Sequence, residues 1–160
     1  MKSVPVSQSH VSMTEMVMPQ HTNALDSVFG GVIMSWIDIA AAISAQRFSG
    51  MPVVTASIDA LSFVAPVYKG WVVNLKASVN YSSRTSMEIG VRVDAENPIQ
   101  KKVFHTASAY LTFVALGPDG KPAMVPSVKT ETPDQVRRFQ AAEIRRQRRL
   151  EERAKLLSKS

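Results

Sequence analysis

The chain has 160 residues, of which 45% are apolar and 20% charged, so it is long enough for one domain with a hydrophobic core and a short extension. It contains no cysteine, which excludes disulfides, thiolate catalysis and cysteine-ligated metal, and its formal net charge is +6. No apolar run of about 18 residues occurs and the N-terminus lacks the apolar core of a signal peptide, so we expect a soluble, cytoplasmic protein with no membrane partner.

The first half of the chain predicts a strand, a loop and a long helix. Residues 1–10 are expected to be a flexible N-terminus, and a short strand near residues 11–17 begins the folded domain. The segment MPQHTNALDSVF, residues 18–29, is rich in turn residues and leads into a helix. The helix is predicted over residues 29–46, because FGGVIMSWIDIAAAISAQ favours helix and has no proline. Since this segment is apolar on every side, we expect it to be buried round nearly its whole circumference.

Asp38 is the only charged residue of that predicted helix. A carboxylate in such surroundings costs several kcal/mol unless it is paired, hydrogen-bonded or protonated. Acids with perturbed environments cluster at functional sites, which favours a functional role for Asp38. A structural role, in which the buried carboxylate accepts a hydrogen bond from nearby backbone, is the alternative.

Gly30 and Gly31 stand at the predicted start of the same helix. The first amides of a helix have no partner within it, so they can donate to an oxygen that carries negative charge, as in an oxyanion hole. The alternative is that the glycines only permit a tight turn. At about 1.5 Å per residue, Gly30 and Asp38 lie about 12 Å apart along the helix. If both act on one carbon, two antiparallel helices of a two-fold dimer must share the site.

After the helix, the apolar pattern changes to the period of a strand. A loosely alternating strand is expected over residues 53–63, and a hairpin over residues 71–79 and 85–93 with its turn at 82–84. A long strand over residues 103–116 follows. One long helix with an antiparallel sheet that must cover it is the layout of the α+β hotdog fold.

Residues 131–160 differ in composition from the rest. They contain nine Lys/Arg and five Asp/Glu, a net of +4, which leaves +2 for residues 1–130. Thr132-Pro133-Asp134 is typical of a helix start, so the tail is predicted to be a basic helix. Its charge fits a solvated helix, an anionic ligand such as a nucleotide or coenzyme, or nucleic acid. Aromatic residues are not interleaved with the basic ones, so no nucleic-acid partner is expected.

Seven fragments resemble, in order, the acyl-CoA thioesterase family with hotdog folds, the acyl-CoA thioester hydrolases: MPQHTN, FGG, MSWIDIAAAI, VVTASIDALSF, APV, SSRTSMEIGVRV and FHTASAYLTFVAL. The resemblance covers about residues 11–126, so we divide the chain into a hotdog thioesterase domain, 11–130, and the tail, 131–160. It implies hydrolysis of fatty acyl-CoA to free fatty acid and CoA without metal or cofactor. It also implies a homo-oligomer, at least a dimer with its helices side by side, and commonly a hexamer of three dimers.

Carried across residue by residue, the resemblance places the family's helix carboxylate at Asp38, its loop asparagine at Asn23 and its glycine pair at Gly30 and Gly31. It implies that the asparagine of one subunit and the carboxylate of the other form one site, in agreement with the spacing above. Whether the acid is the general base or the nucleophile stays open. Family members often have glycine where this chain has Asp26.

Further residues are expected to bind the substrate. Thr55 belongs to one of the matching fragments and is expected to lie at the substrate. The hairpin turn Ser83-Arg84-Thr85-Ser86 offers hydroxyls and a guanidinium for the phosphates of CoA. An exposed polar turn without a ligand is the alternative.

Other chemistries have less support. No G-x-S-x-G motif of the serine hydrolases occurs, and His10, His21 and His105 have no metal-ligand spacing. We expect His21 to be a turn residue and His105 to lie in the core or an interface. A non-catalytic hotdog protein that binds acyl-CoA as a sensor is the alternative function, against which the pair of Asn23 and Asp38 argues.

Overall fold

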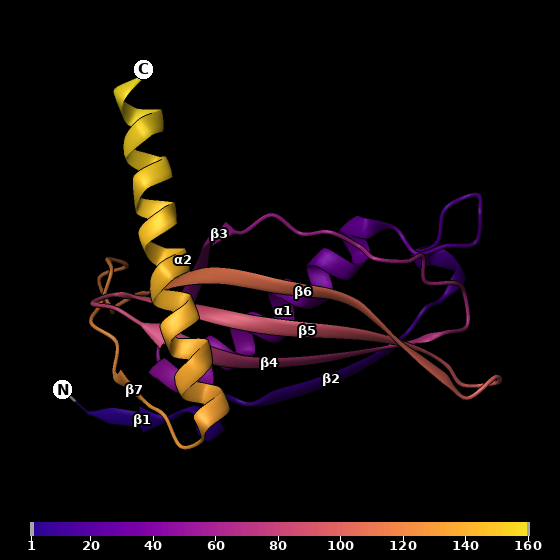
Figure 1. Cartoon of the computed structure of the whole chain (residues 1–160), viewed down its shortest axis with the longest axis horizontal. Helices are drawn as coiled ribbons and strands as arrows, with labels where there is room; N and C mark the ends of the chain where they lie inside the picture. Colours follow the sequence, from indigo (N-terminus) through magenta and orange to yellow (C-terminus); the bar gives the residue numbers. More distant parts are fainter. Residues whose placement is uncertain (1, 160) are drawn as a thin grey trace.

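A five-stranded antiparallel sheet wraps around one long helix in this computed structural model, which describes residues 2–159 (Figure 1). The strand order is β2-β4-β5-β6-β3. The strands are β2 (Val11–Met16), β3 (Val53–Ile58), β4 (Val72–Ser82), β5 (Ser86–Asn97) and β6 (Lys102–Ala115). This is the predicted hotdog arrangement.

The hairpin of β4 and β5 forms the centre of the sheet, and its alternating pattern sets the core. Leu75 pairs with Val93 and Val79 pairs with Ile89, and these side chains are buried. The alternate residues of both strands face away from the core. The predicted strand over residues 53–63 is shorter in the structure, where β3 ends at Ile58 and a loop follows.

Helix α1 (Gly30–Ser49) lies against the concave face of the sheet and ends at Gly50, whose φ of 69° suits glycine. Only one side of the helix is buried, because the sheet covers only that side. On the other side, Met34 is 39% exposed and Ile39 is 51% exposed. The expectation of burial round the whole circumference is therefore wrong for the single chain.

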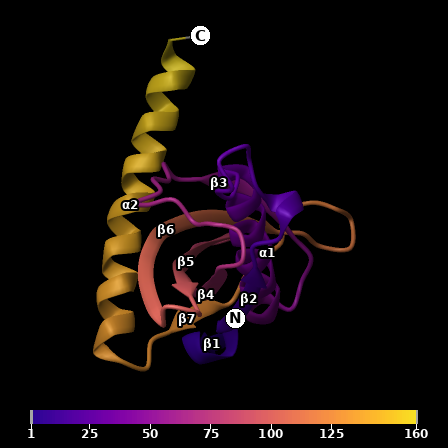
Figure 2. The ribbon, with the colours of Figure 1, turned by 90° about the vertical axis from the view of Figure 1, so that its right-hand side faces the viewer.

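Helix α2 (Pro133–Ser158) forms the basic tail and lies on the opposite face of the sheet from α1 (Figure 2). It begins as predicted, because the Thr132 side chain accepts a hydrogen bond from the backbone N–H of Gln135. Its last turns project beyond the sheet (Figure 1). Neither this helix nor any other within residues 2–159 has the length and hydrophobicity of a membrane span.

The N-terminal segment, which we expected to be flexible, is packed against the rest of the domain. Strand β1 (Ser3–Pro5) pairs in parallel with β7 (Ser127–Lys129), and a 3-10 turn, η1 (Val6–Ser9), follows. The buried Ser9 hydroxyl accepts from the N–H of Val79, and the Ser9 carbonyl accepts from the hydroxyl of Ser44 in α1. These partners lie far away along the chain, and the local sequence carries no sign of them.

Candidate active site

Asp38 lies near the middle of α1 on its open side. The hydroxyl of Thr55 in β3 donates a hydrogen bond of 2.7 Å to the Asp38 carboxylate. The carboxylate is therefore partly exposed and bonded to a side chain. A structural role would need a buried carboxylate bonded to the backbone. It retains further lone pairs that can accept a proton or a water hydrogen.

A β-bulge directly follows Thr55, which faces the helix. Thr55 pairs with Phe113 of β6 and faces α1 as that core residue does, whereas Ser57 pairs with Thr112, so Ala56 is an extra residue in the ladder. Bulges of this kind re-aim side chains and occur next to active sites. Beyond the bulge, the backbone N–H of Asp59 still donates to a carbonyl of β6, and its side chain faces α2.

Asn23 holds together the loop that leads into α1. Its Oδ1 accepts from the backbone N–H groups of Leu25, at 2.9 Å, and Ser27, at 3.3 Å, and its Nδ2 donates to the Ser27 hydroxyl. Asp26, within this loop, has a φ of 59°, in the left-handed region that favours glycine. That conformation accounts for the glycine that the resemblance implies at this position, and aspartate is among the side chains that tolerate it.

The start of α1 offers two amides without acceptors. The N–H of Phe29 donates to the His21 carbonyl and that of Val32 donates to Phe29, but within residues 2–159 neither Gly30 nor Gly31 donates to any group. A Cβ at Gly30 would lie 3.1 Å from the Phe63 ring, whereas one at Gly31 would meet nothing within 4 Å. The two amides can therefore reach an oxygen from outside the chain.

Two of the histidines have other partners. His21, at the end of a 3-10 turn, η2 (Pro19–His21), packs edge-on against Trp36 at 5.1 Å between ring centres, in agreement with a turn residue. His105 lies 3.2 Å from Asp94 on the outer face of the sheet and is 39% exposed, so it is not in the core, and its place in an interface stays a prediction. Within the described chain, no group of three or more possible ligands could hold a metal ion.

One chain does not bring all the predicted groups together. Asp38 and Thr55 meet, and Asn23 organises the loop before the glycine amides, but the amides lie about 12 Å from Asp38 along α1. The hairpin turn is farther away. The N–H of Ala115 donates to the carbonyl of Thr85. The N–H of the next residue, Leu116, donates to the carbonyl of Pro52, just past the end of α1. The turn and the glycines therefore lie at opposite ends of the helix.

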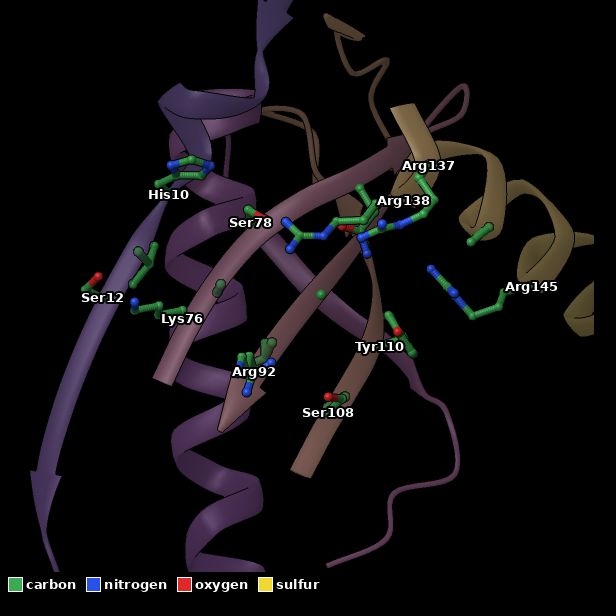
Figure 3. A pocket seen from close by; sticks show the side chains of 17 residues that line it. His10, Ser12, Lys76, Ser78, Arg92, Ser108, Tyr110, Arg137, Arg138 and Arg145 are labelled. Carbon is green, nitrogen blue, oxygen red and sulfur yellow. The ribbon is translucent and has the colours of Figure 1, made fainter. Parts of the chain in front are cut away.

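Two cavities flank α2 on the outer face of the sheet, and neither is lined by Asn23, Gly30, Gly31 or Asp38. The first, of about 670 Å³, lies under the first half of α2 (Figure 3). The second, of about 1090 Å³, lies between the later turns of α2, the end of β3 and the hairpin turn. Thr85 and Ser86 line the second cavity, whereas Ser83 and Arg84 do not. It is also lined by five arginines of α2: Arg145, Arg146, Arg148, Arg149 and Arg153.

A buried ion cluster attaches α2 to the sheet. Glu88 of β5 is 2% exposed and accepts from Arg145 at 2.7 Å and from Arg149 at 3.0 Å. Arg149 also donates to Asp59, at 2.9 Å, and Arg145 lies over the ring of Tyr110. Burial lowers the pKa of Arg145, but the hydrogen bond and charge of Glu88 outweigh it and hold the pKa above its ordinary value. Sequence reasoning missed this cluster, because its members are far apart along the chain.

The fold, with a carboxylate on its central helix, is that of the hotdog thioesterases, and the family description Thioesterase superfamily matches residues 25–101. The rat cytosolic acyl coenzyme A thioester hydrolase is 38% identical over 84% of this chain, which spans 36% of that protein's length. An acyl-CoA hydrolase of Staphylococcus aureus, solved with butyryl coenzyme A and coenzyme A, has a TM-score of 0.90 and 35% identity, covering 98% of this chain and 95% of that one. A hexameric acyl-CoA thioesterase has a TM-score of 0.92 and 36% identity, covering 96% and 99%. The chain belongs to the acyl-CoA thioester hydrolase family.

The S. aureus enzyme has also been solved with an asparagine, an aspartate or a threonine replaced by alanine. In that chain, the asparagine precedes the aspartate by 15 residues and the threonine follows it by 17. Asn23, Asp38 and Thr55 have the same spacing in this chain.

Proposed function

We propose that this protein is an acyl-CoA thioester hydrolase that converts fatty acyl-CoA and water to free fatty acid and CoA, with no cofactor. The observation that carries the proposal is the partnered carboxylate of Asp38 on the open side of the central helix. As general base, Asp38 takes a proton from water as the water oxygen bonds to the thioester carbon. The carbon–sulfur bond then breaks, and the CoA sulfur leaves and takes up a proton. Direct attack by the carboxylate, followed by hydrolysis of the anhydride, is the other route.

The glycine amides polarise the thioester carbonyl, with Gly31 as the first choice and Gly30 as the second. Asn23 holds the loop before them and orients the water or the thioester oxygen. The equal spacing of the substituted asparagine, aspartate and threonine in the S. aureus enzyme supports the roles of Asn23, Asp38 and Thr55.

The active site is shared between two subunits. The distance along α1 separates Asp38 from the glycine amides of its own chain, and an antiparallel partner helix brings the two groups together. The uncovered side of α1 and the exposed edge strand β3 supply the surface that a partner would cover. The hexameric acyl-CoA thioesterase supports a homo-oligomer, and we propose a trimer of such dimers.

The phosphates of CoA bind in the second cavity, beside Thr85 and Ser86. Five arginine side chains line it, and the Thr112 hydroxyl there has no hydrogen-bond partner within residues 2–159. The cavity borders β3, the strand that carries Thr55 to Asp38. Ser83 and Arg84 do not line it, so their contact with the phosphates depends on a neighbouring subunit. A cytoplasmic location agrees with the name of the rat relative.

Replacement of Asp38 by asparagine tests the proposal. Asp38→Asn keeps the shape and the bond from Thr55 but removes the base, so kcat for an acyl-CoA should fall by about 10²–10⁴-fold with folding intact. Turnover is followed by the release of free CoA thiol, with circular dichroism as the check on folding. A folded Asp38→Asn protein with wild-type turnover would exclude the role of Asp38. Absence of hydrolysis by the wild type in a single-turnover experiment, with acyl-CoA bound, would instead identify a sensor.

A further inference from the structure

Asp94, His105 and Ser108 form a hydrogen-bonded chain on the outer face of the sheet. The Nδ1 atom of His105 lies 3.2 Å from an oxygen of the Asp94 carboxylate, and its Nε2 atom lies 3.2 Å from the hydroxyl oxygen of Ser108. Because an ionised carboxylate can only accept hydrogen bonds, Nδ1 carries the proton in this pair. In the neutral ring Nε2 is then an acceptor, and the Ser108 hydroxyl donates to it. This is the order of groups in a Ser-His-Asp triad, where the histidine takes the proton of the serine.

A β-bulge brings the histidine and the serine to the same face. Asp94 of β5 is the register partner of His105, but the register shifts directly before Asp94, so Thr106 is an extra residue in β6. Residues three apart in a regular strand point to opposite faces of the sheet. Here Thr106 is turned inward and is 2% exposed, and both His105 and Ser108 remain on the outer face. Bulges are over-represented next to active sites, where they re-aim side chains.

Arg92 places a positive charge beside the serine. It is the register partner of Ser108 on the neighbouring strand, and both side chains lie at the first cavity (Figure 3). The Nε of Arg92 donates to Asp94 at 3.2 Å, but its two terminal nitrogens donate to no group within residues 2–159. A free guanidinium at this place can stabilise the negative charge that develops on a carbonyl oxygen when the serine attacks the carbon.

The serine is accessible to a small molecule. Ser108 is exposed and lines the first cavity together with Arg92, whereas His105 lies beside the cavity and outside its lining. An acyl group that enters the cavity from this side therefore presents its carbonyl between the hydroxyl and the guanidinium. The three groups are on the opposite face of the sheet from Asp38, so they are separate from the thioester.

We propose that Ser108, His105 and Asp94 form a second hydrolytic site, which acts on small carboxylic esters. As Ser108 Oγ bonds to the carbonyl carbon, His105 Nε2 takes the proton of the hydroxyl, and Asp94 orients the ring. The bond from that carbon to the alcohol oxygen then breaks, and the alcohol leaves with the proton. Water attacks the acyl group on Ser108 and gives a proton to His105, and the carboxylic acid is released as this proton returns to Oγ. The proposal does not rest on the role of Asp38.

The probe for the test is p-nitrophenyl acetate, mixed rapidly with the full-length protein. We expect a burst of p-nitrophenolate that approaches about one equivalent per chain, followed by slower turnover, as the acyl-enzyme forms and is hydrolysed. Peptide mapping by mass spectrometry should find the acetyl group on Ser108. Because the map identifies the acylated residue, hydrolysis of the probe at Asp38 cannot be mistaken for this reaction.

Variants of the three residues should affect the burst differently from matched controls. Ser108→Ala should abolish it, and His105→Gln should slow it by about 10²–10⁴-fold, the range typical of a lost general base. Asp94→Asn should also slow it, and Asp94→Glu should recover part of the rate, because the longer carboxylate can still accept from the ring. Ser12→Ala, at an exposed serine on the same face of β2, and His10→Gln, at an exposed histidine without a serine partner, should leave the rate within about twofold.

Two further measurements separate the triad from chemical reactivity alone. Arg92→Gln should slow the burst by at least about tenfold but leave its size, since the nucleophile and the base remain. Urea-unfolded wild type should show no burst, because unfolding separates the three groups but leaves each accessible. Circular dichroism checks that the variants fold. The proposal is overturned if the wild type shows no burst, if Ser108→Ala or His105→Gln reacts as the wild type does, if the acetyl group is on other residues, or if the unfolded chain reacts as fast.

Discussion

Asp26 shows how a single backbone angle explains a departure from a family pattern. Its φ of 59° is costly for most L-residues, by about 1–2 kcal/mol, and is tolerated by glycine, asparagine and aspartate. Its exposed ion pair with Lys69, at 3.8 Å, adds little. Asp26→Gly should therefore stay within about 1 kcal/mol of the wild-type stability, whereas Asp26→Val should lose about 1–2 kcal/mol. Urea unfolding measures the stability of both variants. A valine variant as stable as the wild type would contradict the left-handed conformation of Asp26.

We expect Thr55 to affect the reaction through Asp38. Thr55→Val keeps the side-chain volume and removes the 2.7 Å hydrogen bond that orients the carboxylate. A hydrogen bond to a charged group is worth about 1.5–3 kcal/mol, so kcat should fall roughly 10- to 100-fold with little change in KM. Thr14→Val is the matched control, because Thr14 also donates to a side chain but lies on β2 away from α1. Equal kcat values for the two variants would show that Thr55 has no role in catalysis.

One buried carboxylate contributes to the attachment of α2. Glu88→Ala leaves Arg145 and Arg149 without their shared partner, and breaking a buried pair on one side costs about 3–5 kcal/mol. The free energy of unfolding in urea should fall by that amount. Glu143→Ala, at an exposed position of the same helix, should change it by no more than about 0.5 kcal/mol. If both variants unfold alike, the cluster does not stabilise the fold.

The main elements were predictable because each leaves a local pattern. The period of two in β4 and β5, the proline-free apolar run of α1 and the cap at Thr132 are all visible within a few residues. The attachment of α2 was not predictable, since Glu88 resembles any outward polar residue of a strand until its partners 57 and 61 residues away are known. The same limit applies to Ser9, whose burial depends on distant partners.

The candidate site was predicted in part. Asp38 stood out as a lone charge in an apolar helix, and the glycines stood out at its start. The sequence pattern gave no sign of the bulge that follows Thr55, because a bulge depends on the pairing of two strands. It gave no sign either that Thr85 and Ser86, but not Arg84, line a cavity with the arginines of α2.

At the scale of the whole molecule, the proposed shared site predicts that activity depends on pairing. Asn23→Ala and Asp38→Ala chains should each be nearly inactive but should recover activity when mixed. With random pairing, about half of the dimers are mixed, and each has one intact and one doubly altered site. The mixture should therefore show about a quarter of the wild-type kcat per subunit.

The mixing experiment requires denaturation and joint refolding, followed by a measurement of size that confirms mixed dimers. Separately refolded parents serve as the control. If mixed dimers form and remain as inactive as the parents, both residues serve the same subunit, and the shared site is wrong.

The extra residue at Ala56 has a consequence for any change in the length of β3. In a regular strand, side chains an even number of positions apart point the same way, so Thr55 and Asp59 would face one side. The bulge inverts the phase between them, and the strand can give a hydroxyl to one layer of the molecule and a carboxylate to the other. Deletion of this one residue would leave Thr55 and Asp59 three positions apart, which in a regular strand still places them on opposite sides, so both contacts would be kept without the bulge. The strand can therefore lose its extra residue and still contact both layers of the molecule.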